Sequence, residues 1–401
     1  MIRNLLVFLG AFSISSDSFT QQISKDSLPV ATLNDCVQYA LRHQPLVQAA
    51  VVDERITEAT IRSRLADWYP QLNLNAALQH NIKVPTAYFN GNFVSTGTKN
   101  TSAVQLGATQ NIFNRDVLLA SRSATDVRKA ARQATDSARI AVIAGVSKAF
   151  YDVLLTQKQL DVLDEDMVRL NRSLQDAYNQ YKGGIVDKTD YKRATITLNN
   201  TKAQRKQEQD AMTARLFFLR QLMGYPDSAS LALQYDSAQL EHEMYFDTTQ
   251  QINYQNRIEV RLLQTVRSLQ GYNLRYYRWG FLPSLSAFGN YNLNYFNNSF
   301  GKLYSQSFPN SNVGVQLSFP IFQGTKRTFQ VRAAELQLQR LDWVMAALQD
   351  EIRTEYAQAL AVYKGNLANY AALKENVQLA TDVYNVIQLQ YQQGIKTYLD
   401  V

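Results

Sequence analysis

The sequence has 401 residues, of which 46% are hydrophobic, 11% aromatic and 19% charged, with 16 glycines and 8 prolines. This composition excludes a disordered or collagen-like chain, and it favours long uninterrupted elements. The net charge of +7 is spread along the chain without a basic block, which gives little support to nucleic-acid binding. The single cysteine, Cys36, excludes an intrachain disulfide and a multi-cysteine metal site.

The N-terminus begins with a short apolar run. Residues 5–14 follow a lone basic residue, Arg3, and are too few to span a bilayer as a helix. They have the length of a signal-peptide core, so we predict a signal peptide over residues 1–22, although 18–22 lack a typical cleavage site. The alternative is an ordinary buried segment. No later run of about 18 apolar residues occurs, which excludes a helical inner-membrane protein.

One pattern occurs twice along the chain. Each copy predicts a helix, a strand, a loop, a second strand, a very long helix and a tight turn. We assign the copies to residues 32–224 and 252–401, joined by a polar linker at 225–251. The opening helices are expected near 33–67 and 252–280. The linker is expected to pack beside the helices as a belt.

Two strand pairs, at 69–113 and 282–322, are predicted from the alternation of apolar and polar residues. The strands are expected near 69–79, 104–109, 282–295 and 313–319, with loops near 83–100 and 296–311. Their opposite faces carry Gln, Asn, Ser or Gly. The apolar faces consist of Leu72, Leu74, Leu78, Val104, Leu106, Val313, Val315, Leu317 and Phe319.

These strands have the length and the aromatic ends of strands in outer-membrane proteins. About ten residues suffice for a tilted strand to cross a bilayer, and Tyr69 and Tyr304 are among the aromatic residues near the strand ends. We therefore predict that the apolar face contacts lipid. The alternative is a soluble sheet with one hydrated face. Four strands cannot close a barrel, so closure needs strands of other copies: two chains would give eight strands, three would give twelve.

Two helices of unusual length are predicted at 115–181 and 323–393. Residues 115–181 and 323–391 contain no proline, and their apolar residues recur at alternating spacings of three and four, which is a heptad seam. In the first seam only Thr156 departs from the apolar pattern. A shift of 210 positions places residues 160–181 on 370–391. A helix of about 67 residues is roughly 100 Å long, so it must pack sideways against other helices.

A glycine-containing turn ends each long helix, at 182–190 and 394–401. Glycine is expected to provide a left-handed C-cap, and Asp187 and Thr397 are candidate N-caps of returning helices. In the first copy we predict the return helix at 188–223, ending at Gly224. In the second copy the sequence ends at Val401, so we interpret it as truncated and expect an unstable or leaky assembly.

From Thr32 to Val401 the sequence resembles the TolC-like outer-membrane efflux and secretion channels. The motifs that carry the resemblance are the helix start Thr32–Leu41 with His43-Gln44-Pro45, and the two tips, Gly183-Gly184-Ile185 with Thr189-Asp190 and Gly394-Ile395-Lys396 with Leu399-Asp400-Val401. The resemblance implies a mainly α fold with β, in which long antiparallel coiled-coil helices form an α-barrel. Two β-hairpins per chain would give four strands to the 12-stranded barrel of a homotrimer.

The resemblance also implies a function and partners. Members are passive exit ducts in the outer membrane of Gram-negative-type bacteria, with a long periplasmic extension. They serve tripartite efflux or type I secretion systems, and a periplasmic adaptor (membrane fusion protein), coupled to an inner-membrane pump, opens the periplasmic tip. The sequence does not identify the cargo, because Asn and Gln in a lumen do not distinguish drugs, metal ions and secreted proteins.

Site residues follow from the resemblance by position. Asp400 would line the constriction, and Lys396, Asp190, Thr189 and Tyr391 would hold it shut through links between helix pairs. The adaptor contacts would be Gly183, Gly184, Ile185, Gly394 and Ile395. An Asp400 ring would favour cations, and a solvated Lys396–Asp190 pair is worth about 0–1 kcal/mol, little enough for a docking partner to open. The alternative is that both aspartates only complement the helix dipole.

Nothing in the sequence indicates an enzyme. Nucleotide-binding glycine loops, HExxH and GxSxG are absent, and His43, His80 and His242 lie far apart. In an extended Glu241-His242-Glu243 segment the histidine points away from its neighbours, so we expect no metal and no cofactor. Cys36 is expected to be a packed side chain. The rival interpretations are a periplasmic or surface coiled-coil scaffold with soluble hairpins, and an enzyme subunit with an unrecognised site.

Overall fold

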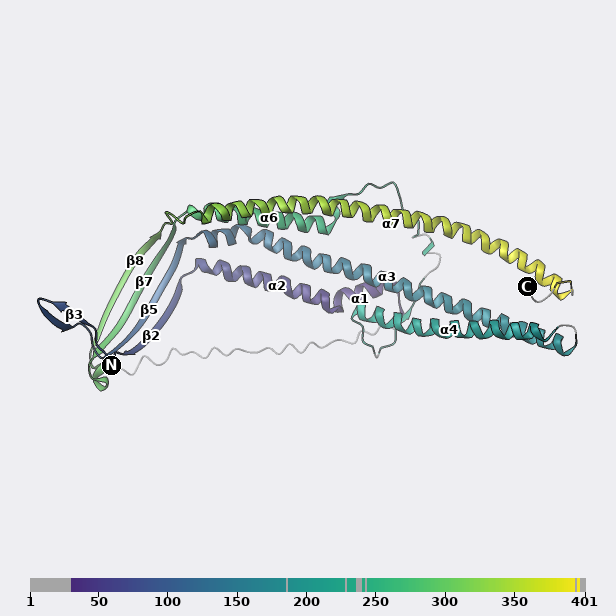
Figure 1. Ribbon diagram of the computed structural model, residues 1–401, viewed down its shortest axis with the longest axis horizontal. Helices are drawn as coiled ribbons and strands as arrows, with labels where there is room; N and C mark the ends of the chain where they lie inside the picture. Colours follow the sequence, from purple (N-terminus) through teal and green to yellow (C-terminus); the bar gives the residue numbers. More distant parts are fainter. Residues whose placement is uncertain are drawn as a thin grey trace.

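The computed structural model describes residues 30–184, 187–227, 229–235, 240–241, 244–393 and 395–396. The molecule is elongated, with a four-stranded sheet at one end and long helices that run away from it (Figure 1). The expected mainly α fold with β is therefore confirmed. No helix in the described ranges is long and apolar enough to cross a membrane. The predicted signal peptide at 1–22 lies outside these ranges.

The sheet consists of four antiparallel strands in the order β2-β5-β7-β8. Their bounds are β2 (Gln71–His80), β5 (Asn100–Phe113), β7 (Ser284–Asn297) and β8 (Ser307–Ser318). The two predicted hairpins form, and β5 pairs with β7 to join them into one sheet. Strands β2 and β8 are left as the edges, because no other described strand pairs with them.

The loop predictions near the sheet were partly wrong. Strand β8 begins at Ser307, inside the loop expected at 296–311. The apolar pattern is missing from its first half, where Ser307, Pro309 and Ser311 lie on the apolar face, so backbone pairing with β7 defines this part of the strand. Within one chain Pro309 is tolerated there because β8 is an edge strand. The loop expected at 83–100 contains a small hairpin, β3 (Thr86–Phe89) and β4 (Asn92–Ser95). Its two-residue turn, Asn90-Gly91, has both residues at positive φ.

The opening helix, expected to be continuous near 33–67, is two helices. α1 (Leu33–His43) and α2 (Pro45–Leu65) are separated at Gln44, whose backbone is extended. A proline disfavours helical backbone in the preceding residue, so Pro45 causes this break. The Gln44 side chain then accepts a hydrogen bond from the Leu46 backbone N–H and caps α2. Thr32 and Asp35 form a reciprocal capping box at the start of α1.

The long helices form as predicted. α3 (Arg115–Lys182) has 68 residues and α7 (Lys326–Gln392) has 67. The return helix α4 (Lys188–Met223) has the predicted bounds, whereas α6 (Ile258–Arg278) is shorter than the expected 252–280. Helices α2 and α4 lie in succession along α3, and α6 lies beside both α3 and α7 near the sheet (Figure 1). The short remaining pieces are the parallel pair β1 (Val30–Ala31) and β6 (Ala232–Leu233), and the 3-10 turns η1 (Ala66–Trp68), η2 (Tyr254–Asn256), η3 (Trp279–Phe281) and η4 (Phe300–Ser305).

The two predicted heptad seams differ in burial. Along α3 every predicted member except Ala134 is buried or half-buried. Thr156, the off-type member, is fully buried, and its hydroxyl donates to the Asp152 backbone O at 2.8 Å. Along α7 the seam is covered only as far as Ile352, where α6 ends beside it, and the members at 359–380 are exposed. The expectation of a packed seam is therefore wrong for this stretch within one chain.

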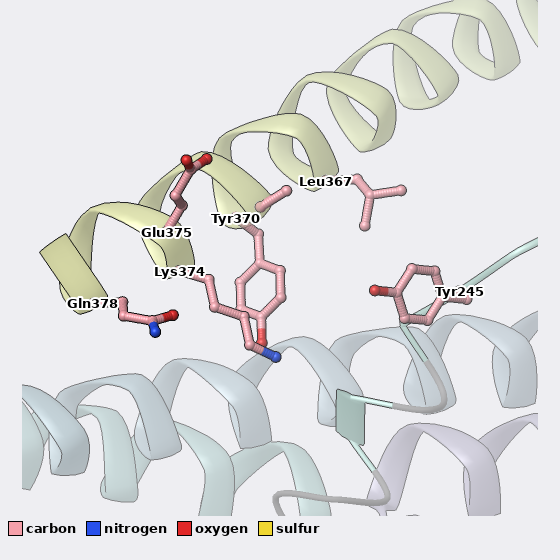
Figure 2. A pocket seen from close by; sticks show the side chains of 7 residues that line it. Tyr245, Leu367, Tyr370, Lys374, Glu375 and Gln378 are labelled. Carbon is pink, nitrogen blue, oxygen red and sulfur yellow. The ribbon is translucent and has the colours of Figure 1, made fainter.

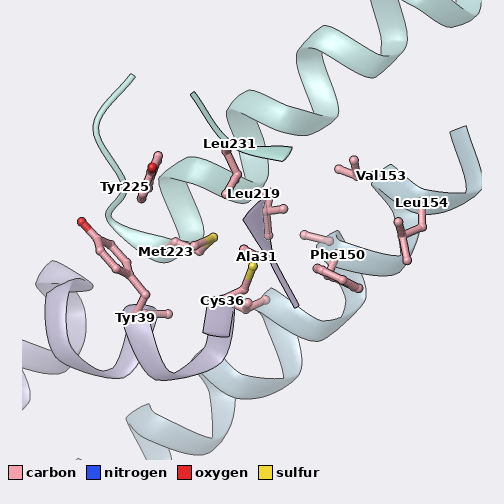
Figure 3. Packing of buried hydrophobic residues seen from close by; sticks show 13 residues of the cluster. Ala31, Cys36, Tyr39, Phe150, Val153, Leu154, Leu219, Met223, Tyr225 and Leu231 are labelled. Carbon is pink, nitrogen blue, oxygen red and sulfur yellow. The ribbon is translucent and has the colours of Figure 1, made fainter. Parts of the chain in front are cut away.

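The main apolar core lies where α1, α3, α4 and the segment 225–233 meet (Figure 3). Cys36, Phe150 and Met223 are among its members, each no more than 2% exposed. Burial raises the pKa of the Cys36 thiol to about 12, which fits the expected packed side chain. The return helix ends at Gly224 as predicted. Gly224 has the left-handed conformation, and a Cβ there would lie 2.7 Å from the His43 carbonyl O.

Candidate functional site

The strand register collects the predicted apolar residues on a single face of the sheet. Leu74, Leu106, Tyr291 and Ser311 pair in a row across the four strands, and directly opposed residues share a face. The predicted residues on this face are Leu72, Leu74, Leu78, Val104, Leu106, Val313, Val315 and Leu317, while Phe319 follows the end of β8. Eight of the nine predicted residues are exposed in the chain, and Val104 is half-buried.

This exposed apolar surface spans the whole sheet. Leu74, at the middle of β2, is 69% exposed, and Val315 of β8 is 64% exposed. Contiguous apolar surface of this extent on a folded chain marks contact with another protein or with a membrane. We call it the apolar face.

The opposite face of the sheet is built from amides, as the alternation predicted. Gln105 Nε2 donates to Asn290 Oδ1 at 3.2 Å, and Asn290 Nδ2 donates to Asn312 Oδ1 at 3.0 Å. Asn292 Nδ2 donates to Asn310 Oδ1 at 2.7 Å, so this ladder crosses β5, β7 and β8. We call it the amide face.

The amide face also contains rings that the alternation did not predict. Phe288 lies against Gly314, where a Cβ would come within 2.8 Å of the ring, so glycine makes room for it. Phe296 and Phe308 pack together near the end of the sheet that is far from the helices, with their centroids 5.7 Å apart.

The first helix tip is held by a short cap and by aromatic contacts. Gly183 has right-handed backbone angles, so the expected left-handed residue is Gly184, with φ of 73°. Asp187 caps α4 as predicted, because its carboxylate accepts from the Thr189 backbone N–H at 3.0 Å. The Tyr191 ring lies 5.2 Å from the Tyr181 ring and ties α4 to the end of α3.

The predicted gate residues are distributed over two tips that lie at the same end of the molecule (Figure 1). Thr189 is exposed and Asp190 half-buried at the first tip, and Ile395 and Lys396 are exposed at the second. Among the described residues no ion pair joins Lys396 to Asp190. Ile185, Gly394, Thr397 and Asp400 lie outside the described residues, and only the backbone of Tyr391 is described. The roles of these residues stay predictions.

Sequence reasoning missed a set of tyrosines on α7 that hold Glu241 and the segment 244–250 beside this helix. The Tyr356 hydroxyl donates to the Gln250 backbone O at 2.8 Å, and the Tyr363 hydroxyl donates to the Met244 backbone O at 2.9 Å. Tyr370 donates to Glu241 Oε1 at 3.2 Å. These tyrosines recur every seven residues, so they share one face of the helix. That recurrence was the available signal, and we call the set the tyrosine row.

Tyr370, the last member of the tyrosine row, lines a cavity of about 440 Å³ between Tyr245 and α7 (Figure 2). Lys374 Nζ lies 2.6 Å from Glu241 Oε1 beside it, and this contact lowers the pKa of the Glu241 carboxyl. His242 and Glu243 lie outside the described residues. In the part of the chain that the structure covers, no group of three His, Cys, Asp or Glu side chains is placed to hold a metal ion.

Replacing Tyr363 with Phe is expected to loosen the segment at Phe246. The Tyr363 hydroxyl both donates to Met244 O and accepts from the Phe246 backbone N–H at 2.9 Å, and a hydrogen bond contributes about 0.5–1.5 kcal/mol. Hydrogen exchange at the Phe246 amide should become roughly ten-fold faster. Tyr356→Phe is the matched control, because it releases Gln250 and should leave the Phe246 amide unchanged. Equal protection of that amide in wild type and Tyr363→Phe would contradict the assignment.

The sequence is similar to a protein-family model and to two characterised bacterial proteins. The model of the outer membrane efflux protein family matches residues 36–225 and 251–401. The alkaline protease secretion protein AprF of Pseudomonas aeruginosa is 22% identical over 263 residues, which are 64% of this chain and 53% of AprF. The outer membrane protein TolC of Vibrio cholerae is 23% identical over 369 residues, which are 89% of this chain and 80% of TolC.

Solved structures share the fold. The outer membrane protein VceC of Vibrio cholerae superimposes with a TM-score of 0.73 at 16% identity, covering 92% of this chain and 88% of VceC. The chain thus spans about half the length of AprF but most of TolC and VceC.

Proposed function

Since the chain belongs to the outer membrane efflux protein family, whose members are outer-membrane channels and not enzymes, we propose that three copies assemble into one passive exit duct. Each copy would give its four strands to a shared 12-stranded barrel, with the apolar face toward lipid and the amide face toward the lumen. The observation that carries this proposal is the sheet itself, which has one exposed apolar face, one amide face and two unpaired edges.

The two unpaired edges of the sheet explain why a single chain cannot form the membrane-spanning barrel. Unpaired backbone groups cannot remain in hydrocarbon, so β2 and β8 need partners, and β8 of one copy would pair with β2 of the next. The helices support the same assembly. Leu373 and Val377 belong to the α7 seam beyond α6 and are 52% and 67% exposed, which favours packing against neighbouring helices. We also infer that residues 32–224 and 252–401 are two copies of one structural unit.

The helix tips would form the periplasmic entrance. We assign the constriction to Asp400, Asp190, Thr189, Lys396 and Tyr391, and adaptor contact to Gly183, Gly184, Ile185, Gly394 and Ile395. The exposure of Gly183, Gly184 and Ile395 supports contact with a partner. A periplasmic adaptor, coupled to an inner-membrane pump, would open the tip for efflux or type I secretion. AprF is named for secretion of a protease, which supports a secreted protein as one cargo class.

Cross-linking of the sheet edges tests the assembly. Asn75→Cys on β2 is combined in turn with a cysteine at Phe308, Asn310, Asn312, Gln316 or Ser318, which all lie on the amide face along β8. Because closure of a barrel staggers the register between strands, one of these positions on the adjacent copy should come opposite Asn75 and form a disulfide. Native Cys36 is fully buried and should form no disulfide with the introduced cysteines. We expect oxidised membranes to give dimer and trimer bands with no larger species, since the ring closes at three. Ladders beyond the trimer, or monomers only for every pair, would contradict the proposal.

A coiled-coil scaffold with soluble hairpins is the alternative. Extraction of the protein from the same membranes distinguishes the duct from the scaffold. The duct should need detergent for extraction and should conduct ions after reconstitution into planar bilayers. A chain that leaves the membrane in salt or alkaline washes would favour the scaffold.

A further inference from the structure

The end of the sheet that is far from the helices has cations but no carboxylates. The sequence contains no Asp or Glu from residue 68 to 115 or from 279 to 334. Lys83, Lys99 and Lys302 lie in the connections between strands at this end, and all three are exposed. An anion that approaches this end therefore meets uncompensated positive charge. We call the three residues the rim lysines.

The rim lysines belong to connections that hold one another in place. The Asn81 backbone N–H donates to the Lys99 carbonyl O at 2.7 Å. The Lys99 backbone N–H donates to Asn298 Oδ1 at 3.0 Å, which joins the loop before β5 to the loop after β7. Asn297 Nδ2 donates to the Lys302 carbonyl O at 3.0 Å. The backbones of Lys99 and Lys302 are thus fixed to the sheet, while their side chains stay exposed.

A pair of tyrosines places one of these lysines beside the apolar face. The Tyr304 hydroxyl donates to Ser102 Oγ at 3.3 Å, and the Tyr304 and Tyr295 rings meet edge to face at 5.0 Å. Ser102 and Tyr295 are directly paired in the sheet, in register with Leu78, so the tyrosine pair caps the apolar face. Lys302 lies two residues before Tyr304 in the same 3-10 turn.

The combination of a long apolar face, tyrosine rings at its end and unpaired lysines fits the headgroup layer of a membrane. Tyrosine rings favour this layer because they are apolar with a polar tip, and lysines bind the phosphates of anionic lipid there. A role toward the lumen would place this tyrosine pair on the amide face, where the separate pair Phe296–Phe308 lies. The tyrosines lie on the apolar face instead, which favours lipid over a passing cargo.

We propose that the rim lysines and the pair Tyr295–Tyr304 bind the phosphorylated headgroups of glycolipid in the outer leaflet. The lysine ammonium groups would donate to phosphate oxygens, and the two rings would pack beside the sugar and the first acyl carbons. This inference rests on the proposed function, because it requires the apolar face to contact hydrocarbon with the rim at the outer surface.

Lipid selectivity of the full-length protein tests the inference. Wild type is reconstituted in phosphatidylcholine vesicles that contain bis-phosphorylated lipid A, and the lipid retained by the protein is counted by native mass spectrometry. Lipid A should be enriched over phosphatidylcholine by roughly five-fold for each rim lysine. The triple variant Lys83→Gln, Lys99→Gln, Lys302→Gln should lose this enrichment, and the triple Arg variant should keep it. Dephosphorylated lipid A should not be enriched.

A matched control replaces three exposed lysines on the helices, Lys148, Lys202 and Lys364, with Gln. This variant loses the same charge and should bind lipid A as wild type does. Equal enrichment by wild type and by the rim Gln variant, with both conducting ions in planar bilayers, would overturn the inference and leave the channel intact. A protein that inserts into neither membrane would overturn the proposed function and this inference together.

Discussion

Arginine in place of Leu74 or Val315 is expected to remove the protein from the assembled outer-membrane fraction. Both residues lie inside strands on the apolar face, and in the chain they are 69% and 64% exposed. An arginine that faces lipid costs about 2–4 kcal/mol near the bilayer midplane, and a symmetric assembly repeats that cost in every copy. Because proteins are stable by only about 5–15 kcal/mol, the double variant should fail to assemble. Fractionation and heat-dependent electrophoretic mobility measure the loss.

The control for this prediction is the same substitution one residue away. Asn75→Arg and Gln316→Arg place the same side chain on the amide face of the same strands, because successive residues of a strand point to opposite faces. An arginine in a wet lumen keeps its hydration, so these variants should assemble. Equal loss on both faces would indicate a general folding defect. Normal assembly of Leu74→Arg with Val315→Arg would show that the apolar face does not contact lipid.

The fold was predictable where local patterns determine it. Alternation with period two identified all four strands and assigned Leu74 and Val315 to one face, and the absence of proline identified both long helices. Local patterns failed where the structure depends on distant residues. Nothing in the sequence near β5 or β7 shows that they pair, because Leu106 and Tyr291 are far apart in the chain. Pro45 by itself predicts the break before it, whereas the continuous apolar pattern around it predicts a single helix.

The candidate site was predictable to a similar depth. The amide face followed from alternation, but Phe288 on it did not, because only the neighbouring strand reveals the space above Gly314. Asp187 was readable as an N-cap from its place after a glycine turn. The tyrosine row was not found, since its hydrogen-bond partners lie in an irregular segment more than one hundred positions away, as with Tyr363 and Met244. A seven-residue recurrence of tyrosine shows a shared helix face but not what that face binds.

Replacing Phe150 with Ala is expected to open the junction where α1 and α4 pack against α3. Phe150 is the largest of the fully buried side chains, at 2% exposure, and its cluster joins α1, α3, α4 and the segment 225–233 (Figure 3). Truncation of a buried Phe removes its burial and leaves a cavity, which together cost about 3–5 kcal/mol. The change should leave the four-stranded sheet intact, because no residue of the cluster belongs to β2, β5, β7 or β8.

Cys36 reports this opening from inside the same cluster. The thiol is fully buried, and because burial raises its pKa to about 12 it stays protonated and unreactive in the folded protein. Maleimide labelling of Cys36 therefore requires local opening, and Phe150→Ala should accelerate it by roughly a hundred-fold or more. Gln157→Ala, an exposed position on α3, should leave the labelling rate unchanged. Unchanged labelling in Phe150→Ala would mean that the cluster does not hold the junction.

The pH dependence of the opening follows from the same thiol. A group with a raised folded pKa stabilises the folded state fully below its unfolded pKa, which is about 9 for this thiol. Stability at the junction should therefore fall as the pH rises from about 9 towards about 12. Urea unfolding followed by circular dichroism measures this loss, because Cys36→Ala has no thiol to label. In Cys36→Ala that part of the alkaline loss should vanish, whereas the cost of Phe150→Ala at neutral pH should persist, because it arises from packing and not from titration. A Phe150→Ala variant that unfolds at the same urea concentration as wild type at pH 7, and is less stable only above pH 9, would contradict a packing origin.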